Sequence, residues 1–208
     1  YLDNSYIGYE LEPVEDPEAD WRLDVYTGSA QLPVLINEYR SAESGTMDAY
    51  HKDGIVAGFL CYPLAGFEGE KWGEQILQFR DALQKAIQEQ AGDDAVTFLG
   101  GAVGLYYGYL DFIAWDLPAI LDAAREFFAG TDLTWGGFHV FRRDVGAVRL
   151  WEQEGAPKVD PETGSLLSAQ DMETLEAFDE GVSGYFGKML QWLDDFVKNG
   201  VQVGKFTE

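Results

Sequence analysis

Apolar residues in the middle of the chain recur with two periods, one typical of strands and the other of helices. Residues 55–64 (IVAGFLCYPL) are almost continuously apolar and predict a buried strand. A helix is expected next, because apolar side chains recur at a spacing of three or four residues: Trp72, Ile76, Phe79, Leu83 and Ile87. Gly92 predicts the end of that helix. Residues 96–99 then predict a short strand, followed by a turn at three glycines, Gly100, Gly101 and Gly104.

The next part of the chain predicts a strand, a helix and two further strands. Residues 105–115 predict a long aromatic strand. Asp116 is placed to cap a second helix, with Pro118 in its first turn, and Gly130 predicts its end. Residues 138–142 and 147–151 then predict a β-hairpin.

This order predicts an α+β fold with a split βαβ, ferredoxin-like core. In such a core, two helices pack on one face of an antiparallel sheet. Two further strands are expected ahead of the core, at residues 21–26 and 34–39, separated by a turn over residues 28–33. Apolar residues at helical spacing near the end of the chain predict C-terminal helices.

We therefore expect four parts along the chain. They are an acidic N-terminal arm (1–20), an α+β core domain (21–151), a polar linker (152–167) and a C-terminal helical extension (168–208).

The long aromatic strand has two apolar faces, so both need a cover. If two helices cover one face, the other is covered by the terminal segments of the chain, by a second copy in a homodimer, or by a partner protein. Tyrosine and tryptophan are common at interface hot spots. Four residues of one face are therefore candidate partner contacts: Tyr107, Tyr109, Asp111 and Trp115.

Charge narrows the classes of partner. The 208 residues include 37 Asp and Glu but 14 Lys and Arg, a net charge of −23, while 46% hydrophobic residues allow a packed core. This charge argues against binding nucleic acid through its phosphates and against docking on anionic membranes. The acidic excess is concentrated in residues 1–20 and 152–195. Carboxylates of the second segment complete the candidate partner contacts: Glu173, Glu176, Asp179, Glu180, Asp194 and Asp195.

No pattern in the sequence predicts a catalytic residue, a metal site or a cofactor. Cys61, the single cysteine, lies in an apolar segment, where a thiol behaves as an inert hydrophobe. The two histidines, His51 and His139, are far apart and lack the spacing of metal ligands. The glycine-rich segment 100–108 leads into a strand, whereas a phosphate-binding loop opens a helix.

Basic residues are scarce, yet Arg142 and Arg143 share the predicted hairpin with His139. They either neutralise carboxylates of this chain or bind an anionic ligand. An alternative function follows, in which a small-ligand-binding protein or hydrolase has its pocket near Asp111, His139 and Arg143. A structural subunit of a larger assembly is a second alternative.

The leading hypothesis is an acidic protein that binds and neutralises a basic partner. Complementary charge accelerates association, and carboxylates can take the positions of nucleic-acid phosphates. In charge, size and α+β class, the chain is similar to bacterial immunity proteins that inactivate a cognate toxin such as a nuclease; no signature residue carries this similarity. It implies a non-enzymatic protein, without cofactor, that inhibits a basic, toxin-like effector. The single cysteine and the lack of a transmembrane or signal-peptide pattern lead us to expect a cytoplasmic location.

Overall fold

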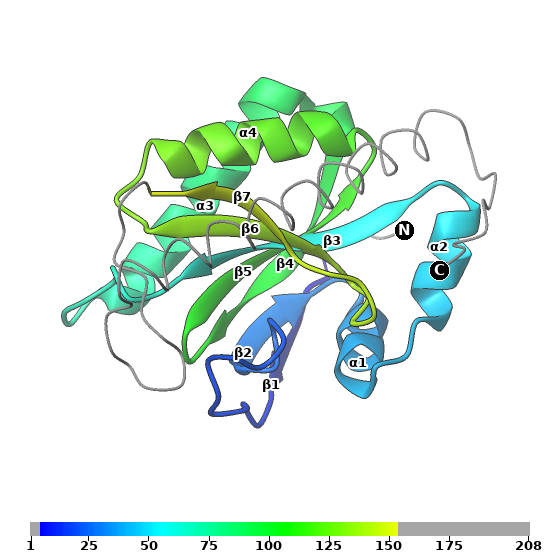
Figure 1. The fold of residues 1–208 in the computed structure, drawn as a ribbon, viewed down its shortest axis with the longest axis horizontal. Helices are drawn as coiled ribbons and strands as arrows, with labels where there is room; N and C mark the ends of the chain where they lie inside the picture. Colours follow the sequence, from blue (N-terminus) through cyan, green and yellow to red (C-terminus); the bar gives the residue numbers. More distant parts are fainter. Residues whose placement is uncertain (1–4, 154–208) are drawn as a thin grey trace, which may run out of the picture.

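The computed structural model describes residues 5–153, which form a mixed α/β structure around one antiparallel sheet (Figure 1). The seven strands of this part of the chain lie in the order β1-β2-β4-β5-β3-β6-β7. Their bounds are β1 (Ile7–Glu10), β2 (Val25–Ala30), β3 (Val56–Pro63), β4 (Val96–Gly104), β5 (Tyr107–Ala114), β6 (Trp135–Val140) and β7 (Val148–Glu152). The helices are α1 (Pro33–Ser41), α2 (Gly45–Lys52), α3 (Trp72–Ala91) and α4 (Leu117–Ala129).

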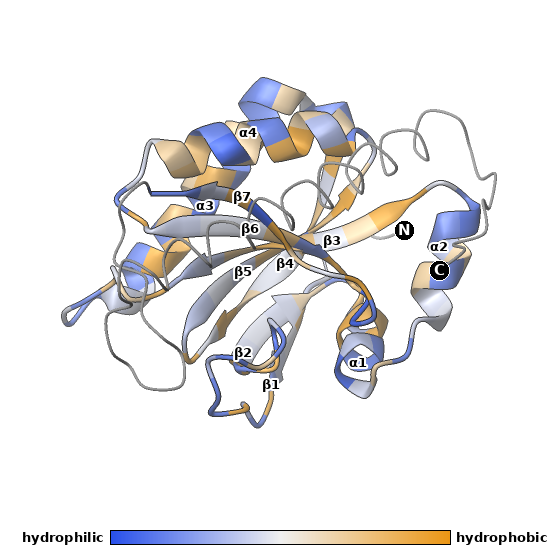
Figure 2. Cartoon of the chain, viewed as in Figure 1, coloured by the Kyte–Doolittle hydropathy of each residue, from blue (hydrophilic) through white to orange (hydrophobic). Residues whose placement is uncertain are grey.

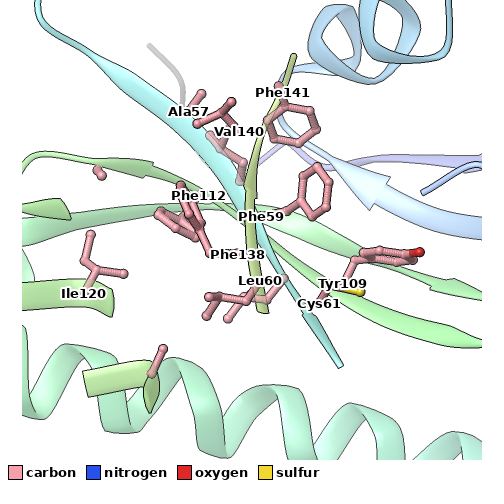
Figure 3. Close-up of a cluster of buried hydrophobic side chains, with 14 of the residues drawn as sticks. Ala57, Phe59, Leu60, Cys61, Tyr109, Phe112, Ile120, Phe138, Val140 and Phe141 are labelled. Atoms are coloured by element: carbon pink, nitrogen blue, oxygen red, sulfur yellow. The ribbon is translucent and has the colours of Figure 1, made fainter. Parts of the chain in front are cut away.

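Helices α3 and α4 pack against each other on one face of the sheet (Figure 1). Hydrophobic and hydrophilic residues alternate along both helices, as expected for helices with one buried side (Figure 2). Figure 3 shows Phe112 and Phe138 on the same side of the strands as Ile120 of α4. All three side chains are at most 1% exposed, so this face forms one part of the core.

The N-terminal part of the chain covers the opposite face. Phe59 and Tyr109 point to this side of the strands (Figure 3). Tyr39 of α1 packs on Phe59, with ring centroids 5.6 Å apart. The segment joining β1 to β2, residues 11–24, places Trp21 and Arg22 over the same face. Of the three covers considered from the sequence, the described structure contains the one supplied by the chain itself.

The strongest periodic patterns are confirmed. The apolar run from residue 55 forms β3, and the residues at helical spacing form α3, which ends at Gly92. Asp116 caps α4, because its Oδ1 accepts a hydrogen bond of 3.2 Å from the backbone N–H of Ala119. The predicted C-terminal hairpin is the pair β6 and β7.

The prediction of a turn at Gly100, Gly101 and Gly104 is wrong, because all three glycines lie inside β4. They are needed for close packing rather than for a turn. A Cβ at Gly100, where φ is +135°, would overlap the backbone carbonyl of Ser29 on β2. A Cβ at Gly104 would overlap the carboxylate of Asp24.

The strand predicted at residues 34–39 is wrong as well, because this segment belongs to α1. Pro33 begins the helix, and Leu35, Ile36 and Tyr39 are buried along one side of it. The turn predicted at residues 28–33 is also displaced, because Gly28 lies in β2. β2 begins at Val25, four residues later than the predicted strand.

The two ends of the predicted organisation have different outcomes. Residues 7–10 of the predicted acidic arm form β1, which pairs with β2 at the edge of the sheet. The predicted linker and C-terminal helices, apart from residues 152–153, lie outside the described residues.

Candidate functional site

The segment 11–24, here called the β1–β2 loop, folds back across the sheet. Pro13 and Pro17 prevent a helix in it. Its base continues the hairpin, since the N–H of Val14 donates to the carbonyl of Leu23 over 2.8 Å. Nearer its tip, the carbonyl of Pro17 accepts a hydrogen bond of 3.1 Å from the hydroxyl of Tyr107. The loop is therefore attached to the sheet by specific contacts.

Arg22 is the centre of this attachment. Its side chain is 2% exposed and forms an ion pair with Asp111 of β5, which is 1% exposed. Nη1 donates to Oδ1 of Asp111, and Nη2 donates to Oδ2 over 3.1 Å. Nη2 also donates to the hydroxyl of Tyr9, over 3.0 Å. Such a two-pronged contact between guanidinium and carboxylate is among the strongest polar interactions in proteins.

Aromatic rings surround the Arg22 guanidinium. Its Cζ lies 5.0 Å from the ring centre of Phe59, 5.1 Å from that of Phe141 and 5.3 Å from that of Tyr109. A planar cation over ring faces is stabilised by the ring quadrupoles, more so where water is excluded. The site thus combines charge pairing with cation–π contact around a single side chain.

A second buried carboxylate, that of Asp24, ties the end of the loop to the β4–β5 turn. Its Oδ2 accepts hydrogen bonds from the N–H of Tyr106 over 3.0 Å and of Tyr107 over 3.1 Å. The hydroxyl of Tyr109 donates to Oδ1 of Asp24 and accepts a hydrogen bond of 2.8 Å from the N–H of Arg22. Tyr109 therefore connects the two ends of the buried polar network.

Burial and charge act against each other in this network. Burial lowers the pKa of Arg22, but the neighbouring Asp111 outweighs it, so the pKa lies above its ordinary value. Burial raises the pKa of Asp111, while the guanidinium lowers it; the net direction is upward. The bidentate geometry is that of a guanidinium paired with a carboxylate. We infer that both groups are charged in the folded chain.

His139 lies beside this network, on β6. Its ring stacks on Phe59 with centroids 5.5 Å apart and packs edge-on against Tyr39 at 5.7 Å. Phe59 pairs in register with Asp111 on one neighbouring strand and with His139 on the other, so it lies between them. Burial lowers the pKa of His139, which keeps the ring neutral at pH 7.

The two arginines of the predicted basic group pair with carboxylates of the same chain. Arg142 contacts Asp48 at 2.6 Å and Asp144 at 2.8 Å. Arg143 contacts Asp20 of the β1–β2 loop at 2.7 Å. Arg143 lies in a surface hollow of about 320 Å³ whose lining also includes three carboxylates: Asp20, Glu43 and Asp144. This lining is net acidic, which does not suit an anionic ligand.

The sequence-predicted contact residues have different surroundings. Tyr109 and Asp111 are buried, and Tyr107 is half-buried beneath the β1–β2 loop. Trp115 is 52% exposed, and its indole N–H donates to the hydroxyl of Thr97 over 3.1 Å. The structure therefore brings Tyr107, Tyr109 and Asp111 together under the loop, and places Trp115 on the surface. The acidic candidates from Glu173 to Asp195 lie outside the described residues.

Known proteins give no guide to this site. No family model, no curated protein and no solved structure matches the chain. Within residues 5–153, no group of three or more His, Cys, Asp or Glu side chains is placed to hold a metal ion. No helix of the described part is long and apolar enough to cross a membrane.

Sequence reasoning missed Arg22, which lies at the centre of the buried polar network. One signal was present, since Arg22 is the only Lys or Arg among the first 39 residues. An isolated cation in an acidic segment is a candidate for pairing inside the fold. The partner, Asp111, is 89 residues away along the chain, so spacing alone does not identify it.

Exposed carboxylates cover the outside of the loop. Glu12, Glu15, Asp16 and Glu18 are all exposed, and none of them forms an ion pair within residues 5–153. Asp20 differs, because it pairs with Arg143. The outer side of the loop is therefore rich in exposed carboxylates on a backbone that is attached to the sheet, with one cation nearby, since Nη2 of Arg40 donates a hydrogen bond of 2.9 Å to the carbonyl of Glu12.

Proposed function

We propose that this chain binds a basic partner protein through the acidic outer side of the β1–β2 loop. The observation that carries this proposal is the combination of a buried anchor with exposed carboxylates that form no ion pair inside the described part of the chain. Glu12, Glu15 and Glu18 face solvent, while Arg22 attaches their backbone to Asp111 inside the sheet.

Attachment matters because a flexible acidic segment loses conformational freedom when it binds. A loop that is attached to the sheet presents its carboxylates as one surface when it first encounters a partner, which reduces this cost at that stage. The net charge of −23 adds a long-range attraction that accelerates encounter with a cation and weakens in salt. Both properties are those of a binding surface for a basic protein.

In its narrower form, the proposal is that the partner is a toxin-like effector and that binding neutralises it, as immunity proteins do. The carboxylates of the loop would then occupy the basic site that holds phosphates of a nucleic acid. A cytoplasmic location belongs to this narrower form; the buried free thiol of Cys61 is compatible with a reducing compartment. A gene for a toxin-domain protein directly beside this one would support it.

We also propose that the segment from β3 to β6 is a split βαβ core. Its strands lie in the order β4-β5-β3-β6, so the first strand of the segment lies between the third and the fourth. The two connecting helices, α3 and α4, lie on one face. This order and the shared helical face support the proposal.

The ligand-binding or hydrolase alternative has less support. It needs Asp111, His139 and Arg143 around one open pocket. Asp111 is engaged by Arg22, His139 is 7% exposed, and Arg143 lies at the surface against Asp20.

Calorimetry with a nona-lysine peptide, over a series of salt concentrations, tests the binding proposal. We expect affinity to fall steeply with salt. Replacing Glu12, Glu15 and Glu18 by Gln should weaken binding about tenfold, the effect of losing a few charge contacts. The matched control neutralises three exposed acids beside or on α3 (Glu68→Gln, Glu70→Gln and Asp81→Asn), which changes net charge equally and leaves the loop intact.

The control should weaken binding by less than about twofold, as expected for charges that act only through a screened field. Equal weakening by both triple variants would show that the loop is not the binding surface. Binding that is indifferent to salt would contradict a charge-driven interaction.

A further inference from the structure

The buried polar site under the β1–β2 loop has the composition of a receptor for a guanidinium group. Five side chains form it, and we call them the guanidinium cage: Asp111, Tyr9, Phe59, Tyr109 and Phe141. Arg22 occupies the cage and is 2% exposed.

The geometry of the cage selects a guanidinium over an ammonium. Asp111 accepts from both terminal nitrogens of Arg22, and Tyr9 accepts a further hydrogen bond from Nη2. Three rings lie 5.0–5.3 Å from the central carbon of the same planar group. A lysine ammonium is a compact point charge that cannot make the parallel pair of hydrogen bonds or stack as a plane.

The pairing of β1 with β2 does not involve the part of the loop that supplies Arg22. The pairing of β1 with β2 involves residues 7–10 and 27–30, outside the loop. Between residues 17 and 22, the loop is held by the Tyr107–Pro17 hydrogen bond, the stacking of Trp21 on Trp135, the Asp20–Arg143 ion pair and Arg22 itself.

Arg22 has a backbone φ of +74°, a left-handed conformation that is unfavourable for a residue with a side chain. In this arrangement the loop therefore carries local backbone strain at Arg22. Strained residues of this kind are concentrated at ligand clamps and switch regions.

We propose that the guanidinium cage binds an arginine side chain of the basic partner, and that Arg22 occupies this site in the unbound chain. This inference rests on the proposed function. The exposed acids of the loop attract the partner, the loop lifts, and an arginine of the partner replaces Arg22 against Asp111. The cage thereby makes the protein selective for arginine-rich over lysine-rich partners.

The first experiment tests the cage alone. Arg22→Gly empties it and tolerates the positive φ. Methylguanidinium in the millimolar range should raise the Tm of this variant by about 3–5 °C, as expected when ligand binding favours the folded state about tenfold in a domain of this size. Methylammonium at the same concentration should not. The added substitution Asp111→Asn in the same variant should abolish the rise. Equal responses to both cations would overturn the proposal.

The second experiment uses the wild-type chain, and so does not depend on the folding of a variant. Hydrogen–deuterium exchange of segments covering residues 14–24 is followed with excess nona-arginine or nona-lysine. Nona-arginine should increase exchange in the loop several-fold, because it displaces Arg22, whereas nona-lysine should leave the loop protected. If hydrogen–deuterium exchange in the loop stays unchanged, or rises equally with the two peptides, the proposed replacement of Arg22 by an arginine of the partner is wrong.

The two proposals fail in different ways. If both peptides bind with the same salt-sensitive affinity and the loop stays protected, the acidic binding surface stands and the arginine exchange is wrong. If neither peptide binds, the binding function is wrong, and the exchange of arginines that rests on it is overturned too.

Discussion

Removing the charge of Asp111 is expected to destabilise the fold strongly. Asp111→Asn leaves the guanidinium of Arg22 in place, 2% exposed, without its counter-charge. Removing one partner of a buried ion pair typically costs about 3–5 kcal/mol, because the remaining charge stays away from water. In a domain of this size, 1 kcal/mol corresponds to about 2–4 °C in Tm. The expected loss is therefore about 6–20 °C.

Urea unfolding followed by tryptophan fluorescence measures this loss. Trp21 and Trp135 stack 5.3 Å apart next to the pair, so the signal reports on the same region. The matched control is Asp122→Asn. Asp122 also pairs with an arginine, Arg125 at 2.8 Å, but the two side chains are 70% and 59% exposed. Exposed pairs contribute about 0–1 kcal/mol, so this variant should unfold nearly like the wild type.

A double variant separates the charge effect from the loss of packing. Arg22→Met with Asp111→Leu removes both charges and keeps apolar volume, so it should recover most of the stability lost in Asp111→Asn. If Asp111→Asn costs no more than Asp122→Asn, the pair is not a buried charge pair and the reasoning is wrong. If the double variant is no more stable than the single one, packing around Arg22, rather than its charge, explains the loss.

Three further predictions concern stability. Burial lowers the pKa of His139 in the folded chain, so the unfolded chain binds a proton there more readily. The free energy of unfolding should therefore fall as the pH drops below about 6.5, by up to about 1.4 kcal/mol per pH unit. In urea unfolding measured over a series of pH values, His139→Phe should reduce this dependence on pH. Asp116→Ala should lower the free energy of unfolding, measured in urea, by about 1 kcal/mol because the α4 cap is lost, whereas Asp116→Asn should keep most of the wild-type stability. Gly100→Ala should lower the Tm markedly, because its Cβ overlaps Ser29, whereas Gly8→Ala, with nothing within 4 Å, should not.

Hydrophobic periodicity correctly predicted the helices and strands whose buried residues follow one regular spacing. The spacing in α3 and the apolar run in β3 are each long enough to distinguish a helix from a strand. Asp116 and Gly130 predicted the ends of α4 because end residues satisfy local hydrogen bonds, which neighbouring residues determine.

The errors have a different physical origin. The composition of residues 34–39 favoured a strand, but Pro33 begins a helix there. Leu35, Ile36 and Tyr39 are the buried residues of this helix. The glycines of β4 resemble turn residues along the chain. Their role depends on Ser29 and Asp24 of distant segments, whose close approach is visible only in three dimensions.

Only the part of the candidate site that lies on a regular strand was predicted from the sequence. Alternation along β5 placed Tyr107, Tyr109 and Asp111 on one face, which the structure brings together under the loop. The residue that completes the site, Arg22, belongs to a loop without periodic pattern. A loop is positioned by its long-range contacts, and these are not encoded in local spacing.

The distribution of arginine links the fold to the proposed binding surface. Arg22, Arg142 and Arg143 each form an ion pair with a carboxylate of this chain. These cations are therefore engaged in holding the β1–β2 loop and the β6–β7 turn, and they do not neutralise the exposed acids Glu12, Glu15 and Glu18. Arg22 thus attaches the loop to the sheet through Asp111, and its charge is not available to the acids on the outer side of the loop. A basic partner would supply positive charge to this acidic surface. An arginine is the basic side chain whose planar guanidinium also fits the guanidinium cage beneath the loop.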